Sequence, residues 1–127
     1  MIALHHVQVA CPPGGEADAR RFYGDGLGLV EVEKPEALRA RGGAWFREYD
    51  LRGAVTVEVH VGVEEPFTPA RKAHPAFVVE DLYAVAGSLV GGAPSLRISL
   101  PGSCVWCASR IARCFCPPSS GGSERHG

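Results

Sequence analysis

The stretch Val55–Val63, VTVEVHVGV, alternates valine with other residues along its whole length. Successive side chains of a β-strand point to opposite faces, so the five valines would form one apolar face. Glu58 and His60 would then share the other face. The segment predicts a half-buried strand that carries a carboxylate and an imidazole on the side away from the core.

The residues before this strand predict further strands and one helix. Residues 3–10 alternate in the same way, which places His6 and Gln8 on one face and His5 on the opposite one. After the turn signal PPGG, the run EADARRFYGDGLGL has apolar residues at helical spacing and ends among glycines. Residues 29–33 and 42–49 predict short strands on either side of the polar loop KPEALRAR, which could also hold a helical turn.

The pattern restarts after the connector EEPFTPARK. AHPAFVVED predicts a strand, LYAVAGSLVGG predicts a helix with Asp81 as its N-cap, and residues 96–100 predict another strand. His6 and His74 each precede an apolar strand and a helix, which indicates an internal repeat. Two such half-size units would pack as one domain, because neither can bury its apolar face alone.

Composition narrows the function. The chain has 127 residues, 46% of them hydrophobic and 21% charged, with a formal net charge of −1, which suits one globular domain that acts on small molecules or contacts another protein. This charge balance favours neither nucleic acid nor a membrane surface as a partner. The N-terminus does not read as a signal peptide, so we expect a cytoplasmic protein. The chain has five cysteines, an odd number, and four of them lie close together near the C-terminus. This distribution suits reduced thiols better than a set of disulfides.

The C-terminal part has a different composition. Residues 82–123 contain no Asp or Glu, whereas the 81 residues before them contain 13. The same density would place roughly seven in that run. Alternation also fades after Leu100, so the sequence predicts no closing strand beyond that point. We interpret the residues from about 103 onward as a replaced ending, such as the product of a shifted reading frame.

This interpretation makes a prediction about the coding DNA. Translation in another frame from about residue 103 should give an alternating strand that contains a carboxylate. If neither other frame encodes such a strand, the frameshift explanation is wrong.

Two groups of residues are candidate metal sites. The first group combines imidazoles and a carboxylate, donors that suit zinc, nickel, iron or manganese: His6, Glu58, His60 and His74. Either Glu58 or His60 could be the ligand on its strand, and each histidine alone could simply be a hydrogen-bonded or surface residue. His5, on the opposite face from His6, is expected to be structural or solvent-facing.

The second group consists of the four thiols Cys104, Cys107, Cys114 and Cys116. Four thiolates can hold zinc, but the six-residue gap and the tight second pair do not match the usual spacings, which favours cysteines without a metal. An interaction protein that binds zinc through this tail is therefore the third and weakest functional hypothesis, after the two given at the end of this subsection. Arg39, Arg41, Arg47 and Arg52 indicate a solvated face or a rim that steers carboxylates.

Several phrases together resemble one known family: LHHVQVACPPGGE, ARRFYGDGLGLVEVEKPEALRARGGAWF, VTVEVHVGVEEPF and KAHPAFVVEDL. They are similar to glyoxalase/bleomycin-resistance/dioxygenase proteins of the vicinal oxygen chelate superfamily. The FYxxxLGL phrase after a first-strand histidine is fairly specific. The resemblance covers about residues 3–100.

This resemblance implies an α+β fold in which two paired βαβββ modules form one curved-sheet cleft, commonly in a homodimer. Module one would span residues 1–63, the connector 64–72 and module two 73–102, followed by the atypical tail 103–127. A divalent metal would chelate neighbouring oxygens of a substrate. Its ligands would fall on His6, on Glu58 with His60 as competitor, and on His74. Glu58 could also move a proton, and Gln8 and Arg47 are predicted to bind substrate.

The sequence departs from the family at the last strand, where the family usually supplies a glutamate ligand after a DPxGN-like turn. The second module is thus predicted to be incomplete or altered at its C-terminus, with weakened metal binding and activity. The leading hypothesis is a glyoxalase-like, metal-dependent lyase, isomerase or dioxygenase acting on a small molecule with vicinal oxygens. The alternative is a metal-free protein of the same fold that binds a small molecule or sequesters an antibiotic.

Overall fold

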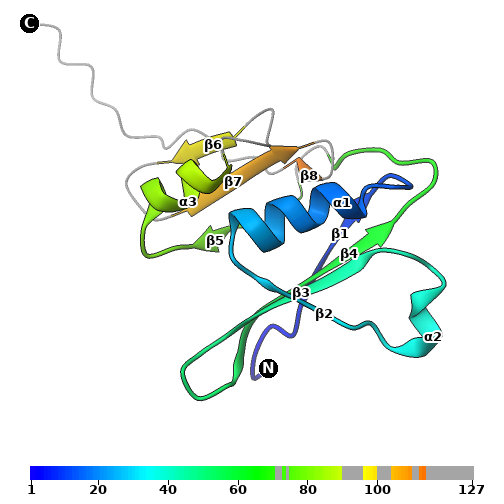
Figure 1. Ribbon diagram of the computed structural model, residues 1–127, viewed down its shortest axis with the longest axis horizontal. Helices are drawn as coiled ribbons and strands as arrows, with labels where there is room; N and C mark the ends of the chain where they lie inside the picture. The colour runs from blue at the N-terminus through cyan, green and yellow to red at the C-terminus, as the bar shows by residue number, and fades with distance from the viewer. Residues whose placement is uncertain (71–72, 74, 90–95, 100–103, 110–111, 114–127) are drawn as a thin grey trace, which may run out of the picture.

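The computed structural model describes residues 1–70, 73, 75–89, 96–99, 104–109 and 112–113 (Figure 1). The first unit comprises strand β1 (Val7–Cys11), helix α1 (Glu16–Ala19), the π-helical segment η1 (Arg20–Gly26), strand β2 (Val30–Val32), helix α2 (Glu36–Arg39), strand β3 (Ala44–Tyr49) and strand β4 (Val55–Val63). The second unit comprises strand β5 (Phe77–Val78), helix α3 (Leu82–Leu89), and strands β6 (Leu96–Ser99), β7 (Cys104–Ser109) and β8 (Ala112–Arg113).

The first unit forms a four-stranded sheet, called sheet A here, with strand order β1-β4-β3-β2. Strand β4 lies in the middle, parallel to β1 and antiparallel to β3. Strand β4 has the bounds that its alternation predicts, whereas β1 begins at Val7 and not at Ala3. Val7, opposite Val59, is the first residue of the chain that pairs with β4, so the strand begins at Val7.

One face of sheet A forms the hydrophobic core. Phe46, Val59 and Val61 are at most 1% exposed, and they pack with Tyr23 and other residues of the α1–η1 helix. The Tyr23 and Phe46 rings lie 5.4 Å apart between centroids. Burial of apolar surface contributes roughly 25 cal/mol for each Å² removed from water, so the packing of the helix on this face of sheet A stabilises the unit. The predicted valine face is confirmed for Val57, Val59, Val61 and Val63, which lie in or against the core, whereas Val55 is 44% exposed.

The predicted helix after PPGG is present, but its second half is wider than an α-helix. The Leu27 N–H donates to the Phe22 carbonyl, five residues back, at 2.9 Å, which is the π-helical pattern. The chain then leaves the helix at Gly28, whose φ of +75° is left-handed. The loop KPEALRAR does hold a helical turn, α2.

The second unit repeats the strand and helix opening of the first. The Ala84 N–H donates to Asp81 Oδ1 at 2.9 Å, so Asp81 caps α3 as its sequence predicts. The strand expected over AHPAFVVED is shorter than predicted, since it comprises only Phe77 and Val78. Phe77, Val79 and Val85 pack against the core of the first unit. The two units therefore share one core.

The described part of the chain contains two strands after Leu100, where the sequence pattern supported no closing strand. Strand β7 lies between β5 and β6 and is antiparallel to both, and β8 pairs with its end. A short apolar run without alternation can be a strand when neighbours bond to both of its edges, and CVWCAS is such a run. In sheet A, however, the strand beside β1 is the fourth and is parallel to it. Among the described residues β5 has no such parallel partner, so the second module is incomplete by comparison.

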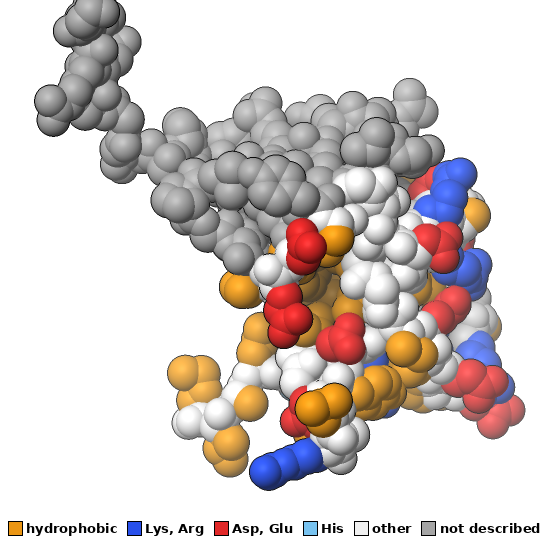
Figure 2. All heavy atoms as spheres, turned by 60° about the vertical axis from the view of Figure 1, so that its left-hand side comes forward, with side chains coloured by type: hydrophobic (Ala, Val, Ile, Leu, Met, Phe, Trp, Pro, Cys, Tyr) orange, Lys and Arg blue, Asp and Glu red, His pale blue; other side chains and the backbone are white. Residues whose placement is uncertain are grey.

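Figure 1 shows the α1 helix between sheet A and the part of the chain that holds α3. Contacts of η1 with β3 on one side and with α3 on the other agree with this layering. On the face in Figure 2, hydrophobic side chains gather below the grey residues, with acidic and basic side chains interspersed. Every helix in the described part of the chain is too short or too polar to span a bilayer.

Gly43 provides a test of the pairing between β3 and β4. Its φ is +85°, and a Cβ atom at this position would collide with the backbone carbonyl of Val61 on β4. A Gly43→Ala substitution should lower the free energy of unfolding by about 3 kcal/mol or more, from the strained φ together with the forced separation of the strands. Chemical denaturation measures this change.

Gly53→Ala is the matched control. Gly53 has a similar φ of +82°, but nothing lies within 4 Å of the position of an added Cβ. It should cost only about 1 kcal/mol, from the backbone conformation alone. Equal losses in the two variants would contradict the proposed collision with Val61.

Candidate functional site

The side of sheet A opposite the core carries the polar residues predicted from the sequence. We call this surface the polar face, and it comprises His6, Gln8, Trp45, Arg47, Glu58 and His60. The strand register brings them together, since Arg47 lies opposite Glu58 while Trp45 and Gln8 both lie opposite His60. Glu58 and His60 are each only 7% exposed. Two buried ionisable groups outside the apolar core require polar partners.

His60 is held between two rings. The Trp45 ring stacks on one side with a centroid separation of 3.7 Å and an interplanar angle of 1°, and the His6 ring stacks with 4.0 Å and 18°. His60 Nε2 lies 2.8 Å from Glu58 Oε1. An ionised carboxylate only accepts hydrogen bonds, so the hydrogen is assigned to Nε2 and the unprotonated nitrogen is Nδ1.

Arg47 is the second partner of Glu58. Its Nη2 donates to Glu58 Oε1 at 3.2 Å, and its Nε lies 3.2 Å from Oε2 at an ion-pair distance, although this N–H is not aligned for a hydrogen bond. Both carboxylate oxygens therefore face the guanidinium. The Glu58 side chain is 4% exposed and that of Arg47 is 32% exposed, so the pair is largely shielded from water on the carboxylate side.

These contacts set the charge states of the site. Burial raises the pKa of the Glu58 carboxyl, but the hydrogen bonds from His60 and Arg47 and the positive charge of Arg47 outweigh burial, and the pKa falls below its ordinary value of 4.5. Burial lowers the pKa of His60 below 6.5, and the hydrogen bond to Glu58 only partly opposes this shift. At neutral pH the site thus combines a neutral imidazole, a carboxylate and a guanidinium.

The structure brings together most of the predicted site residues. His6, Glu58 and His60 lie side by side, and Arg47 and Gln8 belong to the same face. The Gln8 side chain lies over Gly62, because a Cβ at Gly62 would be 2.9 Å from Gln8 Nε2. His74, Cys114 and Cys116 are outside the described residues. Cys104 and Cys107 belong to strand β7, and only their backbone is described.

Trp45 was not among the site residues predicted from the sequence, although the predicted strand 42–49 placed it on the same face as Arg47. Its contact with His60 indicates a structural part in the site that residue type alone did not reveal. His5 is exposed, as expected, but its Nδ1 lies 2.8 Å from Nδ1 of His6. One of these two nitrogens must carry the hydrogen, so this contact restrains the His6 ring.

The polar face as described does not fit a single metal ion. A metal bound to an imidazole lies in the plane of the ring, about 2.0–2.1 Å from the nitrogen. The His6 and His60 rings are nearly parallel and stacked, so one ion cannot lie in both planes at that distance. Both Glu58 oxygens face Arg47. Within the described residues, no group of three or more His, Cys, Asp or Glu side chains is arranged to hold a metal.

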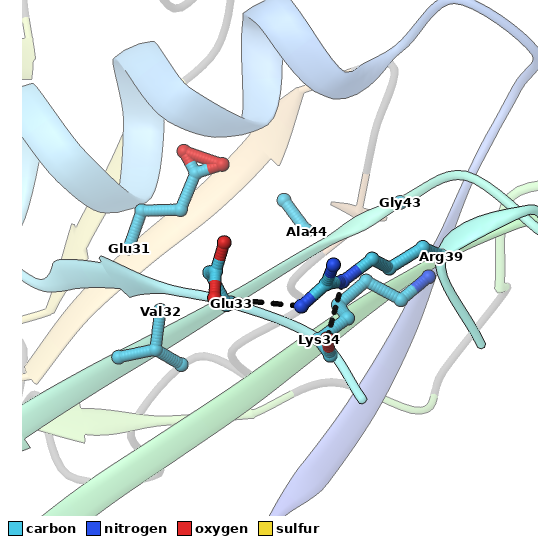
Figure 3. A pocket seen from close by; sticks show the side chains of 7 residues that line it. All are labelled: Glu31, Val32, Glu33, Lys34, Arg39, Gly43 and Ala44. Carbon is cyan, nitrogen blue, oxygen red and sulfur yellow. Dashed lines mark hydrogen bonds and ion pairs between the residues drawn. The ribbon is translucent and has the colours of Figure 1, made fainter. Parts of the chain in front are cut away.

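A hollow of about 420 Å³ lies elsewhere, at the β2 edge of sheet A (Figure 3). None of the predicted site residues lines it. Its charged side chains already have partners: Glu31 pairs with Arg20, Glu33 with Arg39, and Lys34 donates to the Gly42 carbonyl. The hollow therefore offers a ligand few polar groups that are ready to bind, and the polar face remains the candidate site.

Acid should destabilise the folded protein through this site. Below pH 6.5 the unfolded chain protonates His60 more readily than the folded chain does, and below pH 4.5 the same holds for Glu58, so stability falls as pH falls through both ranges. His60→Gln should flatten the dependence of the unfolding free energy on pH between about 7 and 5. Denaturant titrations at several pH values measure it. A slope in His60→Gln equal to that of wild type would refute the assignment.

One solved structure is similar over most of the chain. It is from Bacillus anthracis and is described as a glyoxalase family protein, with 43% sequence identity and a TM-score of 0.60. The match covers 72% of this chain and 70% of that one. No protein-family model matches the chain, and no curated protein matches it either. The identity, the coverage and the βαβββ order of the first unit together establish that this chain belongs to the glyoxalase family of the vicinal oxygen chelate superfamily.

Proposed function

We propose that this chain binds a small molecule with neighbouring oxygen atoms on the polar face of sheet A, without a metal ion. The observation that carries this proposal is the network of Arg47, Glu58 and His60. Burying ionisable groups costs folding free energy, and the core on the other face does not need them. Clusters of buried groups with shifted pKa values are typical of functional sites.

The network supplies groups suited to such a ligand. The exposed part of the Arg47 guanidinium can donate hydrogen bonds to carboxylate, carbonyl or hydroxyl oxygens, for which its planar fork is well matched. Neutral His60 can exchange a proton through Nδ1, while Glu58 holds the ring by Nε2. Trp45 and His6 fix the plane of His60 from both sides, so little ordering is needed when a ligand binds.

A metal-dependent lyase, isomerase or dioxygenase is the second candidate. Two imidazoles and a carboxylate lie within one small area of the polar face, and these are suitable donors for zinc, nickel, iron or manganese. To serve as ligands, the rings of His6 and His60 would have to turn out of their stack and Glu58 would have to leave Arg47. In that form Glu58 would be the group that moves a proton, with His74 as a further proposed ligand. We propose a homodimer for both candidates, the metal-free binding protein and the metal-dependent enzyme.

Metal content of the purified chain separates the two candidates. We expect well below one equivalent of metal per chain, unchanged in a His6→Ala/His74→Ala variant. Inductively coupled plasma mass spectrometry measures it. About one equivalent that is lost in this variant would favour the metal-dependent enzyme. Metal lost instead in a Cys104→Ser/Cys107→Ser control would point to the thiols.

A second experiment tests ligand binding. Small molecules with adjacent hydroxyl, carbonyl or carboxylate oxygens are screened by thermal shift, first without and then with a chelator. A hit should raise the melting temperature of the wild type and of Arg20→Gln, but not of Arg47→Gln. Hits that vanish when the chelator is added, or that persist in Arg47→Gln, would overturn the proposed metal-free site.

A further inference from the structure

The cation nearest to the Glu58 carboxylate belongs to the chain itself. Arg47 and Glu58 lie directly opposite each other on β3 and β4, so the sheet register, and not a loop, holds them together. The distances of 3.2 Å from Nη2 to Oε1 and from Nε to Oε2 engage both oxygens. The carboxylate side chain is 4% exposed, so water competes weakly with this contact.

A divalent ion would have to share this carboxylate with Arg47. Metal–oxygen distances are about 2.0–2.2 Å, so an ion bound by Glu58 would lie close to the guanidinium in a poorly screened environment. Like charges repel strongly there, and an arginine cannot lose its proton to relieve the repulsion. Its pKa is raised further by Glu58 and by Tyr49.

His60, the other partner of Glu58, also opposes metal binding. His60 Nε2 points at Oε1 from 2.8 Å, and its ring is held between Trp45 and His6. With its hydrogen on Nε2, this nitrogen cannot bind a metal while it faces Glu58. Metal binding therefore requires that the contact between Arg47 and Glu58 breaks and that the ring stack opens.

We propose that Arg47 is the built-in cation of this site, and that it keeps Glu58 out of metal coordination and thereby lowers the affinity of the polar face for divalent ions. Arg47 is a positioning residue in this role, because it acts through Glu58. The inference rests on the proposed function only in taking the polar face as the binding site. It concerns the affinity for metal alone and not the identity of the organic ligand.

Titration with Co²⁺ alone tests the inference, because visible absorption reports its coordination without any assay of activity. Wild type should bind Co²⁺ weakly, and Arg47→Gln should bind it at least about tenfold more tightly. The gain should be lost in Arg47→Gln/Glu58→Gln, which would assign it to the carboxylate. Arg20→Gln is the matched control, since Arg20 also pairs with a carboxylate, that of Glu31, but away from the polar face. Its affinity should equal that of wild type.

A folded Arg47→Gln that binds Co²⁺ no more tightly than wild type overturns the proposal. If Arg47→Gln does not fold, Glu58→Gln alone still decides the matter. When Arg47 keeps Glu58 from the metal, this substitution leaves the weak wild-type affinity unchanged. A fall in Co²⁺ affinity in Glu58→Gln would show that Glu58 already binds metal in the presence of Arg47, which also overturns the inference. Neither result affects the chelator-resistant ligand binding that tests the proposed function.

Discussion

The pairing of β4 with both of its neighbours is the constraint on which the rest of the structure depends. Strand β4 bonds to β1 on one side and to β3 on the other, and its alternation assigns one side of sheet A to the core and the other to the polar face. A shift of one residue in this register would exchange Val59 for His60 in the core. The buried helix contact and the candidate site are therefore two results of one strand register.

The polar face is stabilised in a different way from the core. Glu58 and His60 are buried, and each has a polar partner that offsets the loss of water. Arg47 opposite Glu58, and Trp45 opposite His60, come from the same neighbouring strand. Sites built on paired strands hold side chains more rigidly than sites on loops. This rigidity suits a site that binds a ligand without reorganising, and it opposes the ring movements that a metal would require.

The second unit differs from the first in the strand that lies beside its opening strand. The similarity to the glyoxalase family protein covers 72% of the chain. The first unit, whose strands form sheet A, has the full βαβββ order. In the second sheet, β7 occupies the place beside β5, antiparallel to it, where sheet A has its fourth strand parallel to β1. A site that drew equally on two matching modules would need that fourth strand. The described polar residues instead come from sheet A and the residues just before it.

Much of the fold followed from the sequence alone. Period-two alternation predicted β4 with its correct bounds, apolar spacing located the α1–η1 helix, and Asp81 was correctly predicted to cap α3. These features depend on residues close together in the chain, whose side-chain directions follow from local geometry. The sequence also placed Glu58 and His60 on one face, and the FYxxxLGL phrase indicated the family.

The tertiary structure decided what depends on contacts between distant residues. Strand β7 was not predicted, because its run lacks alternation and it forms by bonding to β5 and β6 on both edges. The contact between Arg47 and Glu58 and the stacking of Trp45 on His60 arise from the register of β3 with β4, which no single segment encodes. The sequence by itself therefore determined which residues could form the site, while strand pairing decided that Glu58 faces an arginine and not an open metal position.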